Sequence, residues 1–279
     1  MVSSSTSAST SSNRATELAE CGWRMEFVTQ PDGTTTSVQV PLTASEFLHP
    51  KEGYHLPNST FHDNVAGDAK DMLTRRYAST PDIGVFRDLL IEWDMADLGD
   101  HCPDTFVAFG VQNKEQNRSK FIVPQEGVRP TLIIEVVFPR YRREDREKKV
   151  VEYARARVQE YVIIDRRTYR GQVLDEVLGY RLVSGHYQPI TPDDEGRILC
   201  DTVGLWLSLQ DGCLVMEDAQ TGQRLKTSAE LAAENQELTA ENQELAAAKE
   251  LAQQQAAEMA ALLTRYQEQF GNLPETRKS

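Results

Sequence analysis

Two apolar runs joined by a charged segment decide the fold of this 279-residue chain: Thr131-Leu-Ile-Ile-Glu-Val-Val137 and Glu160-Tyr-Val-Ile-Ile-Asp165. The first run is almost continuously apolar, which is typical of a central strand buried on both faces, and Pro139 ends it. Residues 142–157, between the two runs, are predicted to form a basic helix. The short connections on both sides of this helix favour a right-handed, parallel strand–helix–strand unit.

The predicted helix is expected to turn one apolar stripe inward. Val150, Val151, Ala154 and Val158 form that stripe, and charged residues occupy the rest of the circumference. Residues 138–170 carry eleven basic and six acidic side chains, although the whole chain has a net charge of −13 and a pI of about 4.9. The overall charge argues against a protein that coats nucleic acid generally, because phosphate binding needs a cationic surface. A local positive zone nevertheless surrounds the central unit.

The two ends of the chain differ in composition from its middle, which favours one core domain with appendages. The Ser/Thr-rich start is predicted to be disordered. The expected divisions are a disordered tail at 1–20, an N-terminal hairpin and linker at 21–57, an α/β domain at 58–226, a coiled-coil helix at 227–270 and a tail at 271–279.

Turn residues and apolar periodicity predict the other elements of these divisions. A helix is expected from a cap at Ser59 or Thr60. The remaining predictions are a hairpin at 23–28 and 34–40, strands at 89–93 and 104–111, a loop at 112–125, and hairpins at 179–183 with 187–190 and at 205–209 with 214–217. The chain therefore reads as an α/β core followed by β-hairpins.

Several classes of protein are excluded by composition. The four cysteines have neither metal-binding spacing nor the density of a disulfide framework. No stretch reaches the roughly 18 consecutive apolar residues of a membrane span, and the first twenty residues lack the apolar region of a secretory signal. We therefore expect a cytoplasmic protein with reduced thiols and no membrane partner.

A heptad repeat marks the C-terminal segment. The sequence Ala-Glu-Asn-Gln-Glu-Leu at 233–238 recurs seven residues later at 240–245. With the leucines of both copies at position d, Asn235 and Asn242 fall at position a, which favours a parallel two-stranded register at some cost in stability. The segment is thus predicted to form a homodimeric coiled coil of modest strength. The alternative is a single helix that docks on its own domain.

Glu135 is a carboxylate inside an apolar strand, where a buried charge normally needs a partner or a metal ion. Asp104 opens another apolar strand, and Lys149 lies on the basic helix. Two carboxylates that converge at strand ends suit Mg²⁺ or Mn²⁺ better than zinc. Such an ion can polarise a phosphate and lower the pKa of a bound water. Lys149 would then stabilise developing negative charge or orient the attacking water.

Each of these residues also has a simpler structural interpretation. Lys149 lies four residues after Asp145 and can form an ion pair within the helix. Glu135 can be a structural carboxylate paired with a neighbouring arginine, and Asp104 can be a turn residue after Pro103. Only their combination with the positive zone favours catalysis.

A set of residues along the core matches a known pattern: Pro103-Asp104, Pro130-Thr-Leu-Ile-Ile-Glu135-Val, Pro139, Asp145, Lys149, Tyr153, Glu160-Tyr161 and Asp165. In these residues the chain resembles the Uma-type group of the PD-(D/E)XK nuclease superfamily, and the resemblance extends over nearly its whole length. It implies a restriction-endonuclease-like α/β fold, with a central mixed β-sheet flanked by helices. It also implies a Mg²⁺- or Mn²⁺-dependent endonuclease that acts on DNA.

The resemblance also implies roles for individual residues. Asp104 and Glu135 would bind the metal ion, and the carbonyl group of Val136 would complete the site. In most of the superfamily the lysine stands two residues after the glutamate, which is Val137 here. The Uma-type pattern places its lysine on the following helix, at Lys149.

Three further residues match the pattern as auxiliary positions: His62, Asp145 and Tyr153. His62 can equally be a surface residue near a helix cap. Pro139 follows the strand that contains Glu135, and members of the family usually have small hydroxyl residues around this proline. This chain departs from that pattern.

These departures are Phe138, Arg140 and Tyr141, whose larger side chains would alter substrate access or accompany a loss of activity. Two hypotheses therefore remain open. The first is a metal-dependent DNA endonuclease. The second is a catalytically inactive nuclease-fold protein that acts as a dimeric interaction module or nucleic-acid-binding module.

Overall fold

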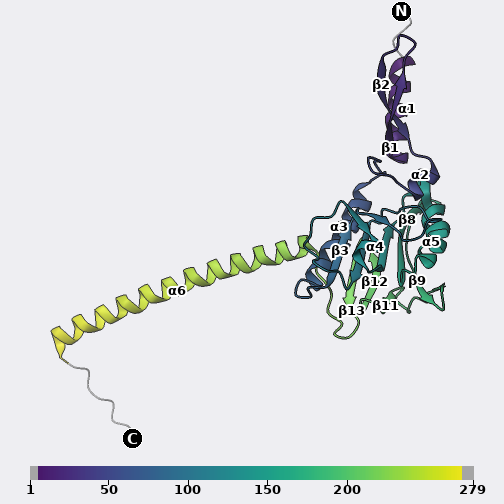
Figure 1. Ribbon diagram of the computed structural model, residues 1–279. Coiled ribbons are helices and arrows are strands. Elements are labelled where there is room, and N and C mark those ends of the chain that lie inside the picture. Colours follow the sequence, from purple (N-terminus) through teal and green to yellow (C-terminus); the bar gives the residue numbers. More distant parts are fainter. Residues whose placement is uncertain (1–5, 272–279) are drawn as a thin grey trace, which may run out of the picture. The chain divides into compact units, whose positions relative to one another are not determined.

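The protein is described by a computed structural model, which covers residues 6–271 and their side chains from residue 13 onward. The chain divides into two compact units, residues 1–227 and residues 228–279. Figure 1 shows that the first contains a sheet with helices on its faces, whereas the second is built on one long helix.

A six-stranded mixed sheet forms the centre of the first unit, in the order β10-β9-β8-β7-β5-β3. Only β7 and β8 are parallel neighbours, and the other adjacent pairs are antiparallel. This arrangement confirms the predicted mixed sheet and the parallel pairing of the two apolar runs. The strands are β3 (Ile83–Arg87), β5 (Thr105–Phe109), β7 (Pro130–Val136), β8 (Glu160–Tyr169), β9 (Gln172–Val183) and β10 (His186–Pro189).

Each face of this sheet packs against a different layer, with α3 and α5 on opposite sides (Figure 1). One face carries α3 (Thr60–Arg76) and the antiparallel strands β11 (Ile198–Cys200), β12 (Leu205–Gln210) and β13 (Cys213–Asp218). The other face carries α5 (Lys149–Arg155), the parallel pair β4 (Leu90–Glu92) and β6 (Lys120–Ile122), and α4 (Val123–Glu126).

The alternation of β7 decides which layer its side chains meet. Leu132 and Ile134 belong to the core on the α3 side, whereas Ile133 belongs to the core on the α5 side. Because successive side chains of a strand point to opposite faces, Glu135 lies on the same face as Ile133. The Glu135 carboxylate is therefore directed towards the helix that carries Lys149.

The predicted helix after Ser59 is confirmed, and its cap fixes the position of His62. The Ser59 hydroxyl accepts a hydrogen bond from the His62 backbone N–H at 3.2 Å, as an N-cap residue does. The apolar stripe of α3, which includes Val65, Met72 and Leu73, is buried against the sheet. His62 is therefore held in the first turn of a well-anchored helix.

The helix predicted over 142–157 is present over 142–155, but it contains a π-helical turn, η2 (Glu144–Lys148), before the short α5. A 3₁₀ turn, η1 (Pro139–Tyr141), precedes it. π-helical turns are rare, and many lie at functional sites.

The predicted inward stripe of this helix is wrong in part. Val151 is 60% exposed, whereas Lys149 and Tyr153 are buried. Asp145 is buried as well, and the spacing of four residues places all three on one face. Hydrophobic periodicity misses this face because charged and hydroxyl groups fill it.

The N-terminal segment contains the predicted hairpin, β1 (Trp23–Thr29) and β2 (Thr35–Pro41). The predicted disorder over 1–20 is wrong where the structure describes it, because α1 spans Thr6–Cys21; residues 1–5 lie outside the description. The last two turns contain several strong helix formers. The Arg14 guanidinium donates a hydrogen bond to the Gln39 carbonyl at 2.9 Å, and Cys21 is buried. A second short helix, α2 (Ala44–Leu48), follows the hairpin.

Three other elements differ from the predicted ones in their boundaries. The predicted loop at 112–125 contains β6 and the start of α4. Strands β8 and β9 extend into a hairpin around Arg170 and Gly171, whose φ angles of 51° and 79° suit the type I′ turns that match strand twist. The strand predicted at 89–93 is β4, which has three residues and pairs outside the main sheet.

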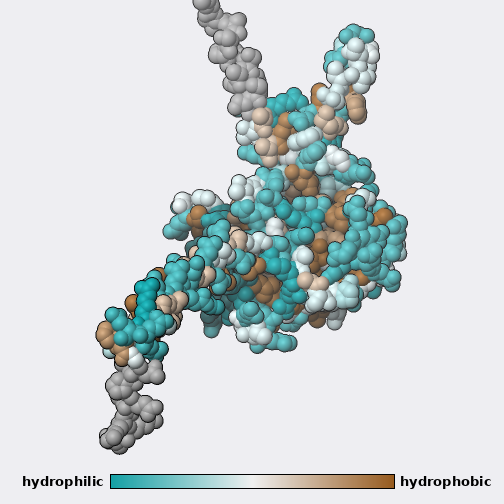
Figure 2. Space-filling model, turned by 90° about the vertical axis from the view of Figure 1, so that its left-hand side faces the viewer, coloured by the Kyte–Doolittle hydropathy of each residue, from teal (hydrophilic) through white to brown (hydrophobic). Residues whose placement is uncertain are grey.

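The second unit is α6 (Ser228–Phe270), which confirms the predicted helix. None of its 43 residues is buried. Figure 2 shows a mainly hydrophilic surface with scattered hydrophobic residues along this helix. Except for Gly271, the predicted tail lies outside the described residues. Within residues 6–271, no helix has both the length and the apolar character needed to cross a membrane.

Candidate functional site

A cavity of about 300 Å³ lies at the end of β7. Six of the seven predicted site residues line it. The seventh, Tyr153, is not part of the lining, but its hydroxyl donates a hydrogen bond to Glu135. The structure thus brings together residues from the start of α3, the edge of β5, the end of β7 and the η2–α5 segment. The lining residues from the predicted set are His62, Asp104, Glu135, Val136, Asp145 and Lys149.

A larger cavity of about 570 Å³ lies beside α3, and two of the cations that line it, Lys114 and Arg118, already have partners. Lys114 donates hydrogen bonds to the backbone carbonyls of Tyr77, Ala78 and Thr80. Arg118 forms a bidentate pair with Glu126. The smaller cavity therefore has the more reactive set of side chains.

Asp104 directly precedes β5 and links that strand to β7. Its Oδ2 accepts a hydrogen bond from the Val136 backbone N–H at 2.6 Å, and its Oδ1 lies 3.0 Å from Nε2 of His62. The His62 side chain is 13% exposed, and its Nδ1 lies 3.1 Å from Oδ1 of Asn58. His62 therefore lies near the helix cap, as the simpler interpretation expects, but its side chain is mostly buried against Asp104. Asp104 is more than a turn residue, because both its oxygens are held at the cavity wall.

Glu135 is held by two donors from α5. Its Oε1 lies 2.9 Å from Nζ of Lys149 and accepts a hydrogen bond from the Tyr153 hydroxyl at 2.7 Å. The expected arginine partner is thus replaced by Lys149. The predicted pair within the helix is present as well, since Lys149 Nζ lies 2.8 Å from Oδ1 of Asp145. One buried ammonium group therefore bridges two buried carboxylates.

The site contains more acidic than basic side chains. Three buried carboxylates, those of Asp104, Glu135 and Asp145, share Lys149 and His62. Burial raises the pKa of Glu135 to about 8, and repulsion from the other two carboxylates adds to this rise although Lys149 opposes it. Burial likewise raises the pKa of Asp145. Both pKa values are raised because the buried site disfavours the ionised forms of these two carboxyl groups.

The pKa shifts of Asp104 and Lys149 have causes in the same contacts. Burial acts to raise the pKa of Asp104, but His62, Lys149 and the Val136 N–H together bring it below its usual value. Burial also acts to lower the pKa of Lys149, yet the neighbouring carboxylates raise it above its usual range. Lys149 thus remains a fixed positive charge.

The donor set fits a divalent cation. Asp104 and Glu135 supply carboxylate oxygens at the same cavity, and a bound cation would favour the ionised form of Glu135, which burial disfavours. Oδ2 of Asp145 is buried and has no hydrogen-bond partner among the described residues. Oxygen-rich sites of this kind suit Mg²⁺ or Mn²⁺.

Of the three unusual residues after β7, Tyr141 has a clear structural role. The Tyr141 hydroxyl lies 2.9 Å from the carbonyl oxygens of both Cys21 and Leu42, and its ring stacks on Phe47 at 4.0 Å. Phe138 lines the cavity, whereas Arg140 is exposed. Tyr141 therefore connects the N-terminal segment to the edge of the site.

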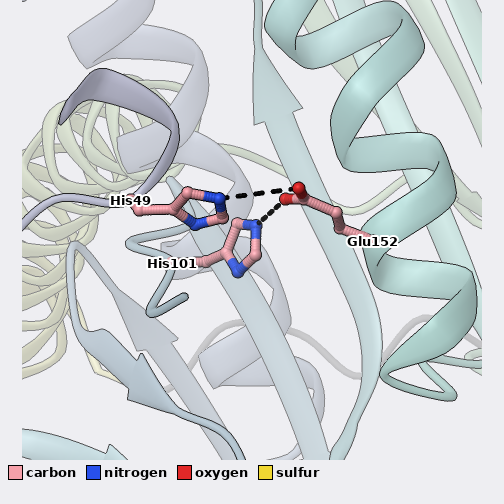
Figure 3. Close-up of side chains that lie close together, drawn as sticks. All are labelled: His49, His101 and Glu152. Carbon is pink, nitrogen blue, oxygen red and sulfur yellow. Dashed lines mark hydrogen bonds and ion pairs between the residues drawn. The ribbon is translucent and has the colours of Figure 1, made fainter. Parts of the chain in front are cut away.

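A second cluster was missed by the sequence interpretation. His49, His101 and Glu152 converge beside α5, as Figure 3 shows. Nε2 of His101 lies 2.8 Å from Oε2 of Glu152, and Nε2 of His49 lies 3.5 Å from Oε1. No spacing motif reveals this cluster, because about fifty residues separate each member from the next.

The mixed sheet, whose central strand ends at a cavity lined by two carboxylates and a lysine, defines a restriction-endonuclease-like protein. Residues 55–210 match the Uma2 family, described as "Putative restriction endonuclease", and the chain belongs to this family. The predicted resemblance and fold class are thereby confirmed.

A solved structure, described as a "putative nuclease" from Anabaena variabilis, is 15% identical with a TM-score of 0.40. The match covers 58% of this chain and 91% of that chain. No curated protein matches the chain significantly.

Proposed function

We propose that the protein is a metal-dependent endonuclease that hydrolyses DNA phosphodiester bonds at the 300 Å³ cavity. The observation that carries this proposal is the environment of Glu135. This carboxylate is buried at the end of a central strand, is bound by Lys149 and Tyr153, and shares the cavity with Asp104. Membership of a family described as nucleases supports the same assignment.

In this proposal Asp104 and Glu135, with the carbonyl oxygen of Val136, hold Mg²⁺ or Mn²⁺. Carboxylate and carbonyl oxygens are the ligands that these hard cations prefer. When bound, the ion polarises the scissile phosphate and lowers the pKa of an attacking water. Its charge would also relieve the repulsion that raises the pKa of Glu135.

The residues around the carboxylates fix their positions before the reaction. His62 and the Val136 N–H hold Asp104, while Tyr153 and Lys149 hold Glu135. During hydrolysis the water oxygen forms a bond to phosphorus, the bond from phosphorus to the leaving oxygen breaks, and negative charge develops on the phosphate. Lys149 stabilises this charge without a large rearrangement, because its ammonium group is already oriented by two carboxylates.

Metal dependence gives the first test. Purified full-length protein should nick supercoiled plasmid in the presence of Mg²⁺ or Mn²⁺ and should leave it intact in the presence of EDTA, because the proposed site needs a divalent cation. Agarose gel electrophoresis measures the conversion of supercoiled to open-circular DNA. Failure to cleave single-stranded or double-stranded nucleic acid with either ion would favour the inactive interaction module.

We also propose that α6 forms a homodimeric coiled coil. The helix has 43 residues, none of them buried, and it exposes Leu238, Leu245 and Met259 at the d positions of the heptad repeat. A long helix with an apolar seam is stabilised by pairing with a second copy. Asn235 and Asn242 at position a favour the parallel register.

Truncation after Lys226 tests this proposal. Full-length protein should sediment as a dimer, whereas protein lacking residues 227–279 should sediment as a monomer, because the heptad seam supplies the interface. Sedimentation velocity over a range of concentrations distinguishes the two states. A truncated protein that stays dimeric would show that the main interface lies elsewhere.

A further inference from the structure

The segment from Thr43 to His49 lies before the matched region 55–210, yet it reaches the candidate site. It contains α2, which begins with a reciprocal capping box between Thr43 and Glu46. Phe47 places its ring 5.1 Å from Nζ of Lys149, close enough for a cation–π contact. Phe47 also lines the cavity. The first contact of this segment is therefore with the lysine of the site.

The second contact joins the end of α2 to the middle of α5. Nε2 of His49 lies 3.5 Å from Oε1 of Glu152, and Oε2 of the same carboxylate lies 2.8 Å from Nε2 of His101 (Figure 3). Glu152 directly precedes Tyr153 and lies three residues after Lys149. A group that fixes Glu152 therefore also fixes the helix that presents both site residues.

The ring of His49 is closely packed against its neighbours. Its Nδ1 lies 3.3 Å from the carbonyl oxygen of Asp100, which orients the ring. A Cβ atom at Gly99 would lie 2.5 Å from the same ring, so the absence of a side chain there permits the approach. The ring also meets that of His101 edge-on at 5.0 Å. The His49 contact is thus built into the fold.

Two histidines and a glutamate could also bind a transition metal, but the hydrogen bonding of His101 opposes this interpretation. Nε1 of Trp93 donates a hydrogen bond to Nδ1 of His101 at 2.9 Å, and an indole nitrogen can only donate. Burial lowers the pKa of His101 to about 4, so the ring is neutral near pH 7. Its proton must then be on Nε2, which leaves no lone pair for a metal ion on the side facing Glu152.

We propose that residues 43–49, together with His101, form a positioning element for α5, which they hold through Lys149 and Glu152. This inference rests on the proposed function, because it matters for catalysis only if Lys149 and Tyr153 act there. The element is needed because α5 ends a single helical run over 142–155 whose regular pitch is interrupted by a π-helical turn. A helix of this length has little stability of its own without packing against the rest of the fold.

Substitution of Glu152 in the full-length protein tests this proposal. Glu152→Ala removes the contacts with His49 and His101, and amide hydrogen exchange in residues 144–155 should become about tenfold faster, because local opening is less costly. Exchange in β12 should not change. At saturating metal, kcat for plasmid nicking should fall about tenfold with KM unchanged, since small displacements of catalytic groups are costly. Glu152→Gln should restore both values, because its amide oxygen still accepts the His101 N–H.

The control is Glu195→Ala, which removes an acid that is 72% exposed and lies outside the site. Three results would overturn the proposal: unchanged exchange in Glu152→Ala, faster exchange with unchanged kcat, or tight binding of one Zn²⁺ by calorimetry that Glu152→Ala abolishes. The last result would make the cluster a metal site. If the wild-type protein cleaves no DNA, the proposed function fails, and the exchange measurement still decides whether the segment holds α5.

Discussion

Glu135→Gln should lower the rate of metal-dependent plasmid nicking by about a thousandfold, equivalent to the several kcal/mol that a catalytic cation contributes. Gln has nearly the same shape as Glu but lacks the negative charge that would hold the cation. Its amide oxygen can still accept the hydrogen bond from the Tyr153 hydroxyl, which donates to Oε1 of Glu135 in the wild-type protein. We therefore expect a folded protein with an unchanged circular dichroism spectrum.

Glu147→Gln is the matched control for this experiment. Glu147 lies on η2, its side chain is 65% exposed, and it pairs with Arg143 at the surface. The same chemical change there should leave the nicking rate within about twofold of wild type, because surface substitutions rarely matter. Nicking that persists in Glu135→Gln at the wild-type rate would remove Glu135 from the site.

Lys149→Met should reduce both activity and stability. The side chain of Lys149 is only 5% exposed, and its ammonium group bridges Glu135 and Asp145. Removal of one partner from a buried ion pair costs about 3–5 kcal/mol, because the remaining charge is left without compensation. The nicking rate should also fall by about a hundredfold, since a preoriented positive charge is lost from the transition state.

Denaturant unfolding measures the free energy of unfolding, and plasmid nicking measures the rate. Lys120→Met is the control, because Lys120 pairs at 3.8 Å with Glu52, whose side chain is 84% exposed. Exposed pairs contribute about 0–1 kcal/mol, so this variant should behave almost as wild type. Equal stability losses in the two variants would contradict the assignment of Lys149 as the buried bridge.

Much of the fold was predictable because its central unit has a strong local pattern. The apolar run that contains Glu135 forms β7, and the run that ends at Asp165 begins β8, its parallel neighbour. The Ser59 cap and the two C-terminal hairpins are also present. In each case the signal lies within about 35 residues, where periodicity and turn chemistry act directly.

The inward face of α5 was not predictable from hydrophobicity. Lys149 is buried by its pairing with two carboxylates, and one of these, Glu135, comes from a distant strand. A single sequence does not show such pairing, so the exposed Val151 was assigned inward in error. The helix α1 was missed because Ser and Thr dominate the composition of its first half.

The candidate site was predicted in its residue set but not in its contacts. Asp104, Glu135 and Lys149 share one cavity, and their catalytic roles remain a proposal. The hydrogen bonds of His62 and Tyr153 came only from the structure. The contribution of α2 to the same cavity was also not foreseen, because Phe47 and Lys149 lie about a hundred residues apart.

The position of a bound divalent cation tests the central claim most directly. Crystals of the full-length protein soaked in Mn²⁺ can be measured at the manganese absorption edge, where an anomalous difference map locates the ion. We predict a peak between the carboxylates of Asp104 and Glu135 and the carbonyl oxygen of Val136. A peak at His49, His101 and Glu152, with no peak at the first site, would contradict the account.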